Sequence, residues 1–166
     1  MRTMVLKERL RTSAPSDDVT YIARAQTLSA LQTLGPERKV LLLEFIFETK
    51  LIQFGPQGEP PVISLRFANL SETNLVKRSI LSNTDLDRAE LIDAKLDNAM
   101  LINTQLTRAD LRGAHLSGAD LSGANLARAE GVRCQQTRGA ESLDGATMPN
   151  GQKYEDWLKD RQGCRE

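Results

Sequence analysis

A leucine recurs every five residues through the middle of the chain, and this period limits the fold more than any other feature. Leu occurs at 70 and 75 and then, after one extra residue, at every fifth position from 81 to 126. An α-helix repeats every 3.6 residues and a strand every second residue, so neither explains a period of five. A very short extended segment followed by a corner does explain it.

The residue two positions before each of these leucines is small, being Ala, Thr or Ser. Side chains alternate along extended backbone, so we expect the small residue and the leucine to share the interior side. The two residues after each leucine are rich in Ser, Asp, Asn, Gly and Arg, which are typical of exposed turns. Gly113, Gly118 and Gly123 fall at such turns, and we assign them to corners rather than to a phosphate-binding loop.

If each unit makes one right-angled corner, four units close a coil of twenty residues. Residues twenty apart would then be neighbours in adjacent coils. Two sets of charged residues have this spacing, namely the arginines Arg88, Arg108 and Arg128 and the acids Glu90, Asp110 and Glu130. The spacing favours four units per coil over three.

The run ADLRGAHLSGADLSGANL at 109–126 resembles the pentapeptide-repeat family, whose unit is A-(D/N)-L-x-x, in the type found in photosynthetic bacteria. The segments 23–34 and 143–151 are also similar to sequences that flank such repeats. The resemblance implies an all-β solenoid, a right-handed quadrilateral β-helix with leucine at the centre of each inner face. We expect about three regular coils and a fourth, irregular one.

The rest of the chain is predicted to protect the ends of this solenoid. Open ends would expose unpaired edges and leucine side chains, so we expect α-helical caps at both ends. The predicted regions are a flexible arm (1–18), a two-helix cap (19–54), a linker and entry strand (55–67), the repeats (68–131), an irregular coil (132–150) and a helical cap (151–166).

Each predicted helix has signals of its own. The first starts near Val19 with Asp17 or Asp18 as its cap. The second runs from Pro36 to about Ile52. The third runs from about Gln152 to Arg161 and stops at Gly163. The predicted apolar faces are Ile22, Ala25, Leu28 and Leu31 in the first helix, Leu42, Phe45, Ile46 and Phe47 in the second, and Tyr154, Trp157 and Leu158 in the third.

Three sets of residues are candidates for contacts. The arginines and acids listed above predict a salt-bridge ladder, for which an anion site is the alternative. Apolar side chains at outward positions predict a protein-contact patch made of Ile80, Met100, Ile102 and Ile92. Either a partner or the N-terminal helices would cover that patch. Tyr154, Trp157 and Leu158 would cap the C-terminal end or join two copies of the chain.

The residues give no support for an enzyme. His115 is the only histidine, and a leucine-filled solenoid offers no pocket in which catalytic groups converge. The carboxylates at 85, 87, 93 and 97 lie on a convex exterior and lack a calcium-loop pattern. Cys134 and Cys164 are thirty apart without a CxxC motif, which predicts two reduced thiols. We therefore expect no catalytic residue, metal or cofactor.

Charge and hydropathy limit the kinds of partner that we expect. Lys plus Arg and Asp plus Glu both number 22, so no overall field attracts nucleic acid or a membrane surface. No secretory signal or membrane span is recognisable, and we expect a cytoplasmic monomer or weak homodimer. The predicted function is a non-catalytic scaffold that presents side-chain ladders to an unidentified protein. The resemblance to pentapeptide repeats implies an alternative, a DNA-mimicking gyrase inhibitor, which the nine acids and eight bases of residues 62–131 disfavour.

Overall fold

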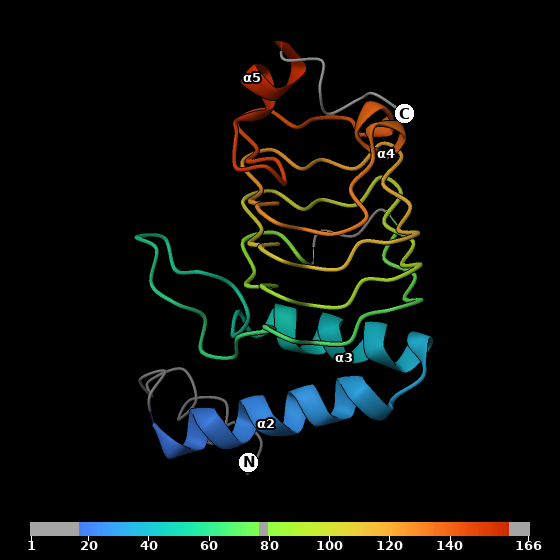
Figure 1. Ribbon diagram of the computed structural model, residues 1–166. Helices are drawn as coiled ribbons and strands as arrows, with labels where there is room; N and C mark the ends of the chain where they lie inside the picture. Colours follow the sequence, from blue (N-terminus) through green and yellow to red (C-terminus); the bar gives the residue numbers. More distant parts are fainter. Residues whose placement is uncertain (1–16, 77–79, 160–166) are drawn as a thin grey trace.

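Stacked coils of the chain form a column with helices at both ends (Figure 1). The structure is a computed structural model that describes residues 17–76 and 80–159. Its helices are α2 (Asp18–Thr33), α3 (Pro36–Glu48), α4 (Cys134–Gly139) and α5 (Tyr154–Lys159). Helices α2 and α3 lie at one end of the column, and α4 and α5 lie towards the other. None of the helices described is long and apolar enough to cross a bilayer.

Parallel β-bridges connect successive coils at the spacing predicted from the sequence. In the regular region they join residues twenty apart: Asp85 to Gln105, Glu90 to Asp110, Lys95 to His115 and Met100 to Asp120. These four pairs belong to four columns, one on each face of the coil. The bridges are isolated pairs rather than long strands, because each five-residue unit turns a corner before a second pair can form.

Insertions shift this register without breaking it. Asn69 bridges to Glu90, a spacing of 21, because one extra residue lies between Leu75 and Leu81. Asp120 bridges to Ser142, a spacing of 22, because α4 replaces one regular side of the last coil. This last coil is the predicted irregular one. Its Leu143 and Met148 are buried like the leucines of the regular coils.

A left-handed residue occupies the second turn position of most units. At one corner Arg88 has φ 58°, and the backbone N–H of Ala89 donates to the Leu86 carbonyl at 3.0 Å. Gly113, Gly118 and Gly123 take φ values of 70°, 67° and 67° at equivalent corners, as predicted. Asn and Gly adopt this conformation readily, whereas Arg pays a steric cost. The corners therefore combine the turn chemistry of the sequence with some backbone strain.

The interior is a stack of leucines lined by small residues. Leu101 and Leu106 are fully buried, and Ala109 and Thr104 are buried beside them. The threonines do not leave a polar atom unsatisfied, since the hydroxyl of Thr104 donates to the Leu81 carbonyl at 2.8 Å. Alternation of small residue and leucine thus fills the coil as the sequence predicted.

Helix α3 lies against the first coil through a face that overlaps the predicted one only in part, because Ile46 is buried but Phe45 is not. Its buried residues are Lys39, Val40, Leu43 and Ile46. Phe45, which was predicted to be buried, is 61% exposed. The Nζ of Lys39 donates to Asn69 Oδ1 at 2.9 Å, and this polar contact selects a face that a search for apolar residues passes over. Helix α3 also ends at Glu48 rather than near Ile52.

Helix α2 starts where predicted and buries Leu31 of its predicted apolar face, but its other buried residues were not predicted. Thr20, Thr27 and Leu31 are buried, whereas Ile22 is 54% exposed. The threonines can be buried because their hydroxyls donate to backbone carbonyls one helical turn earlier, that of Thr27 to Ala23 at 2.9 Å. Asp17 occupies the N-cap position, but its side chain makes no capping hydrogen bond.

The C-terminal part departs from the predictions in two further ways. Helix α4 was not predicted, and the Nε2 of Gln136 fastens it to the coil by donating to the Ala114 carbonyl at 2.7 Å. Cys134 is disulfide-bonded, so the prediction of a reduced thiol is wrong there. Cys164 and the predicted end of the last helix at Arg161 and Gly163 lie outside the described residues.

Candidate functional site

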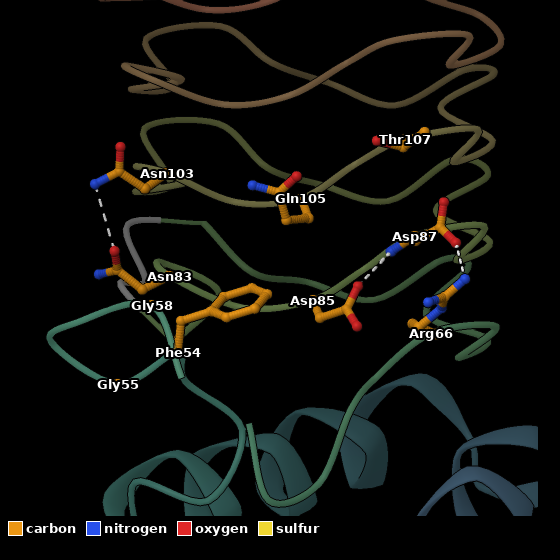
Figure 2. A pocket seen from close by; sticks show the side chains of 10 residues that line it. All are labelled: Phe54, Gly55, Gly58, Arg66, Asn83, Asp85, Asp87, Asn103, Gln105 and Thr107. Atoms are coloured by element: carbon orange, nitrogen blue, oxygen red, sulfur yellow. Dashed lines mark hydrogen bonds and ion pairs between the residues drawn. The ribbon is translucent and has the colours of Figure 1, made fainter. Parts of the chain in front are cut away.

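A groove lies between one face of the solenoid and the loop that leads into it (Figure 2). Its volume is about 710 Å³, and its walls are Phe54, Gly55 and Gly58 of the loop and polar residues of three successive coils. Figure 1 shows the loop standing away from the column of coils. This face carries the column that runs from Asp85 through Gln105 to Asn125.

Hydrogen bonds hold the loop in shape before any partner arrives. The Gly55 N–H donates to the Glu59 carbonyl at 2.9 Å, and the Gly58 N–H donates to the Gly55 carbonyl at 2.9 Å. The Phe54 N–H donates to the Asn83 carbonyl at 2.7 Å and ties the start of the loop to the coil. A ligand that enters this groove would therefore spend little free energy on ordering the loop.

The solenoid wall of the groove is a ladder of amide and hydroxyl groups. Asn103 Nδ2 donates to Asn83 Oδ1 at 3.4 Å across two coils. Asn125 Nδ2 donates to Gln105 Oε1 at 3.1 Å in the next column. Each side-chain amide has donors and an acceptor left over after one such bond, so the ladder can also bond to a ligand.

Two carboxylates and one guanidinium set the charge of the groove. Arg66 forms an ion pair with Asp87 at 2.5 Å. Asp85 accepts from the Ser64 hydroxyl at 2.8 Å and from the Asp87 N–H at 3.3 Å, and both of these donors are neutral. The groove thus has a net charge of about −1, which suits a neutral or cationic group better than an anion.

The predicted apolar patch is not a continuous surface. Ile80 is buried with 7% exposure, Ile102 and Ile92 are half-buried, and Met100 is 44% exposed. The column continues from Met100 to Asp120, which is polar. Only Met100 therefore remains as a markedly exposed member of the set. The prediction treated Ile80 as outward, but the extra residue nearby moves it out of the regular pattern.

The predicted salt-bridge ladder forms its acidic half only. Glu90, Asp110 and Glu130 are bridged in one column as expected. The ion-pair partner of Asp110 is Arg112, at 2.5 Å, rather than Arg108. Hydrogen bonds from the Arg112 side chain lower the pKa of the Asp110 carboxyl below its ordinary value.

The three predicted arginines occupy left-handed corners instead of the acidic column. Their φ values are 58° for Arg88, 56° for Arg108 and 60° for Arg128. Arg88 lies over the ring of Phe67, with 5.4 Å from its guanidinium carbon to the ring centroid. These arginines therefore share a column with each other, as the twenty-residue spacing predicted, but not salt bridges with the acids.

The other candidates sit near the C-terminal end or on the opposite face. Trp157 is buried and stacks on Tyr154 with 6.1 Å between ring centroids, whereas Leu158 is exposed. His115 Nδ1 lies 3.8 Å from an Asp97 carboxylate oxygen on the outside of the coil. Among residues 17–76 and 80–159 no group of three or more His, Cys, Asp or Glu side chains is placed to hold a metal ion.

Sequence reasoning missed the groove itself. Phe54 and Asp85 are 31 residues apart, and only the fold of the linker brings them together. The Gly and Pro residues of the segment 55–61 predicted a loop but carried no information about which face it would cover.

Comparison with known proteins finds similarity in the repeat region of the chain. The family model for pentapeptide repeats matches residues 63–108 and 104–130, with eight copies. A solved pentapeptide repeat protein from the cyanobacterium Cyanothece 51142 is 32% identical, with a TM-score of 0.45, over 57% of this chain and 62% of that one. One from the thylakoid lumen of Arabidopsis thaliana is 28% identical, with a TM-score of 0.34, over 51% of this chain and 61% of that one.

A third solved structure is a pentapeptide repeat protein of Nostoc sp. strain PCC 7120 that is involved in the regulation of heterocyst differentiation. It is 30% identical, with a TM-score of 0.32, over 61% of this chain and 46% of that one. The chain spans less than two thirds of the length of each of these three proteins. The comparison with curated proteins found no match. Residues 63–130 therefore match the pentapeptide-repeat family model, with eight copies of its unit and the same leucine period.

Proposed function

We propose that this protein is a non-catalytic binding module, in which a right-handed quadrilateral β-helix presents a fixed polar surface to a protein partner. Pentapeptide repeats are typically structural or interaction modules, and the chain has such repeats at 63–130. The observation that carries the proposal is the groove between the loop at Phe54–Gly58 and the amide ladder. The groove is a concave part of the surface, and recognition sites are usually concave.

Rigidity supports this role. Leucines fill the interior, and every coil is hydrogen-bonded to the next through backbone groups, for example from Leu106 N–H to the Asn125 carbonyl at 2.8 Å. A surface fixed in this way loses little conformational entropy on binding. The interior leaves no space for substrate, so a partner has to be recognised on the outside.

The helices at the two ends act as caps in this proposal. Helix α3 covers the first coil, and its Lys39 bonds to Asn69 there. Trp157 of α5 is buried at the other end. Covered ends prevent the solenoid from pairing with other copies through its open edges. The buried position of Trp157 favours capping over its alternative role as a dimer contact.

DNA mimicry remains the alternative function. The stacked acids Glu90, Asp110 and Glu130 form one acidic column. Arginines at the adjoining corners and Arg112 offset it, and residues 62–131 have a net charge of −1, from eight bases and nine acids. Duplex DNA carries one negative charge per about 1.7 Å of its axis, far more than this column offers.

Site-specific photo-crosslinking in the native cell tests the proposed function. A photoreactive residue at Gln57, in the loop, should give a covalent adduct with one protein of defined mass. The matched control is a photoreactive residue at Lys95, whose column lies on the opposite face. Adducts from the control position alone, or from neither position, would contradict the proposal.

A further inference from the structure

Among the described residues that line the groove, Asp85 is a carboxylate that no ion pair compensates. Its side chain is half-buried. Its hydrogen-bond donors, the Ser64 hydroxyl and the Asp87 N–H, carry no charge. The nearby cation Arg66 is ion-paired with Asp87, and no Lys, Arg or His of the described residues lies within ion-pair distance of Asp85. A half-buried carboxylate in this setting attracts a cation from outside the chain.

Phe54 supplies a second group that favours a cation. Figure 2 shows its ring extending along the groove towards Asp85. The backbone that carries the ring is held in place, because the Phe54 N–H donates to the Asn83 carbonyl at 2.7 Å and the preceding Gln53 bridges to Thr84. The face of an aromatic ring carries partial negative charge and attracts ammonium and guanidinium groups.

The remaining walls select against other ligands. An anion would meet the two carboxylates of Asp85 and Asp87. An apolar group would cover the amides of Asn83 and Gln105 without bonding to them, which costs free energy. A guanidinium has five N–H donors, and the carboxylate, the amide oxygens and the Thr107 hydroxyl are acceptors for them.

We propose that this groove binds the cationic end of an arginine or lysine side chain of a protein partner, between the Phe54 ring and the Asp85 carboxylate. The inference rests on the proposed function, because it names the group of the partner that the binding module recognises. Arginine fits better than lysine, since its planar guanidinium can stack on the ring and bond to the carboxylate in the same pose.

The test is a titration of the ¹⁵N-labelled full chain followed by NMR. The probes are N-acetyl-arginine methylamide, the corresponding lysine compound, the neutral glutamine compound and spermidine. The arginine compound should shift the backbone amide signals of Phe54, Asp85 and Gln105, with a weaker effect of lysine and none of glutamine. Spermidine separates a partner's side chain from a free polyamine as the source of the cation.

Variants make the test specific. Asp85→Asn loses the charge but keeps one oxygen that can accept from the Asp87 N–H and an amide group that can donate to the Ser64 hydroxyl. Arginine binding should therefore weaken by about fivefold or more. Phe54→Leu keeps the bulk of the side chain but loses the aromatic face, and should weaken binding as well. Asp120→Asn is the matched control, because Asp120 is also half-buried and accepts from neutral groups of Ser122, but on a neighbouring face.

Each outcome separates this inference from the proposed function. Equal binding of the glutamine compound, tighter binding of spermidine than of the arginine compound, or unchanged binding by Asp85→Asn would overturn the cation site. In each of these cases an adduct from Gln57 in the crosslinking experiment would still support a protein-binding module. Arginine binding without any protein adduct would instead contradict the proposal that the groove binds a protein partner.

Discussion

Replacing one interior leucine by alanine measures how much the leucine stack contributes to stability. Leu101 is fully buried in the middle of the regular coils. Leu101→Ala removes three carbon atoms, and at about 0.8 kcal/mol per buried CH₂ the transfer contribution alone is about 2.4 kcal/mol. The cavity left behind adds to this, because the neighbouring coils are hydrogen-bonded to each other and cannot close on it. We expect a total loss of about 3–4 kcal/mol, within the range of about 2–5 kcal/mol seen for buried leucines.

Urea denaturation followed by circular dichroism gives this free energy of unfolding, and a thermal melt gives an independent reading. For a chain of this size each kcal/mol lowers Tm by about 2–4 °C, so the melting temperature should fall by roughly 6–16 °C. The control is Leu41→Ala on the outside of α3, where the side chain is 65% exposed. It should cost less than about 0.5 kcal/mol. A loss below about 1 kcal/mol for Leu101→Ala would refute the tightly packed leucine interior.

Three further predictions concern a corner, a cap and a thiol. Arg108→Gly should raise the urea midpoint, since relief of a left-handed Arg (about 1–2 kcal/mol) exceeds the added backbone entropy of Gly (about 0.5–1 kcal/mol). A lower midpoint would show that the corner is not strained. Burial lowers the pKa of Lys39 below its ordinary 10.5, and Glu72 and Glu90 offset part of that shift. Between this lowered pKa and 10.5, Lys39 holds a proton more often in the unfolded chain than in the folded one. Stability should therefore increase with pH in that window, and Lys39→Met should remove the increase. Parallel stability–pH curves for Lys39→Met and the wild type would contradict this. Thiol titration of the denatured, unreduced protein should find no reactive Cys134, because that residue is disulfide-bonded, whereas a reactive Cys134 would restore the prediction of a reduced thiol.

The coils were predictable from sequence because their rules are local. A buried leucine, a small residue two positions earlier and a turn after it can be read within five residues, and Arg88 and Arg108 already reveal the neighbouring coil. The same logic located the irregular coil from Leu143 and Met148.

The caps and the site depend on contacts between distant segments, and there the sequence was a poorer guide. Thr20 and Thr27 are buried in α2 because their hydroxyls donate to backbone carbonyls, so the predicted apolar stripe marked only part of the buried face. Lys39 is buried because Asn69, thirty residues away, accepts from it. The groove forms because Phe54 of the loop lies on the same face as Asp85, and no local sequence pattern predicts this neighbourhood.

The central claim is that four five-residue units close one coil, so that residues twenty apart are neighbours. A pair of engineered cysteines tests it directly. Adjacent coils lie about 4.8 Å apart, within the Cα separation of about 4.4–6.8 Å that a disulfide spans. Gln105 and Asn125 form such a bridge, so Gln105→Cys with Asn125→Cys should form a disulfide under mild oxidation, identified by mass spectrometry of tryptic peptides. Gln105→Cys with Asp120→Cys, fifteen residues apart, should stay reduced. Oxidation of the fifteen-residue pair and not of the twenty-residue pair would indicate three units per coil and contradict the account.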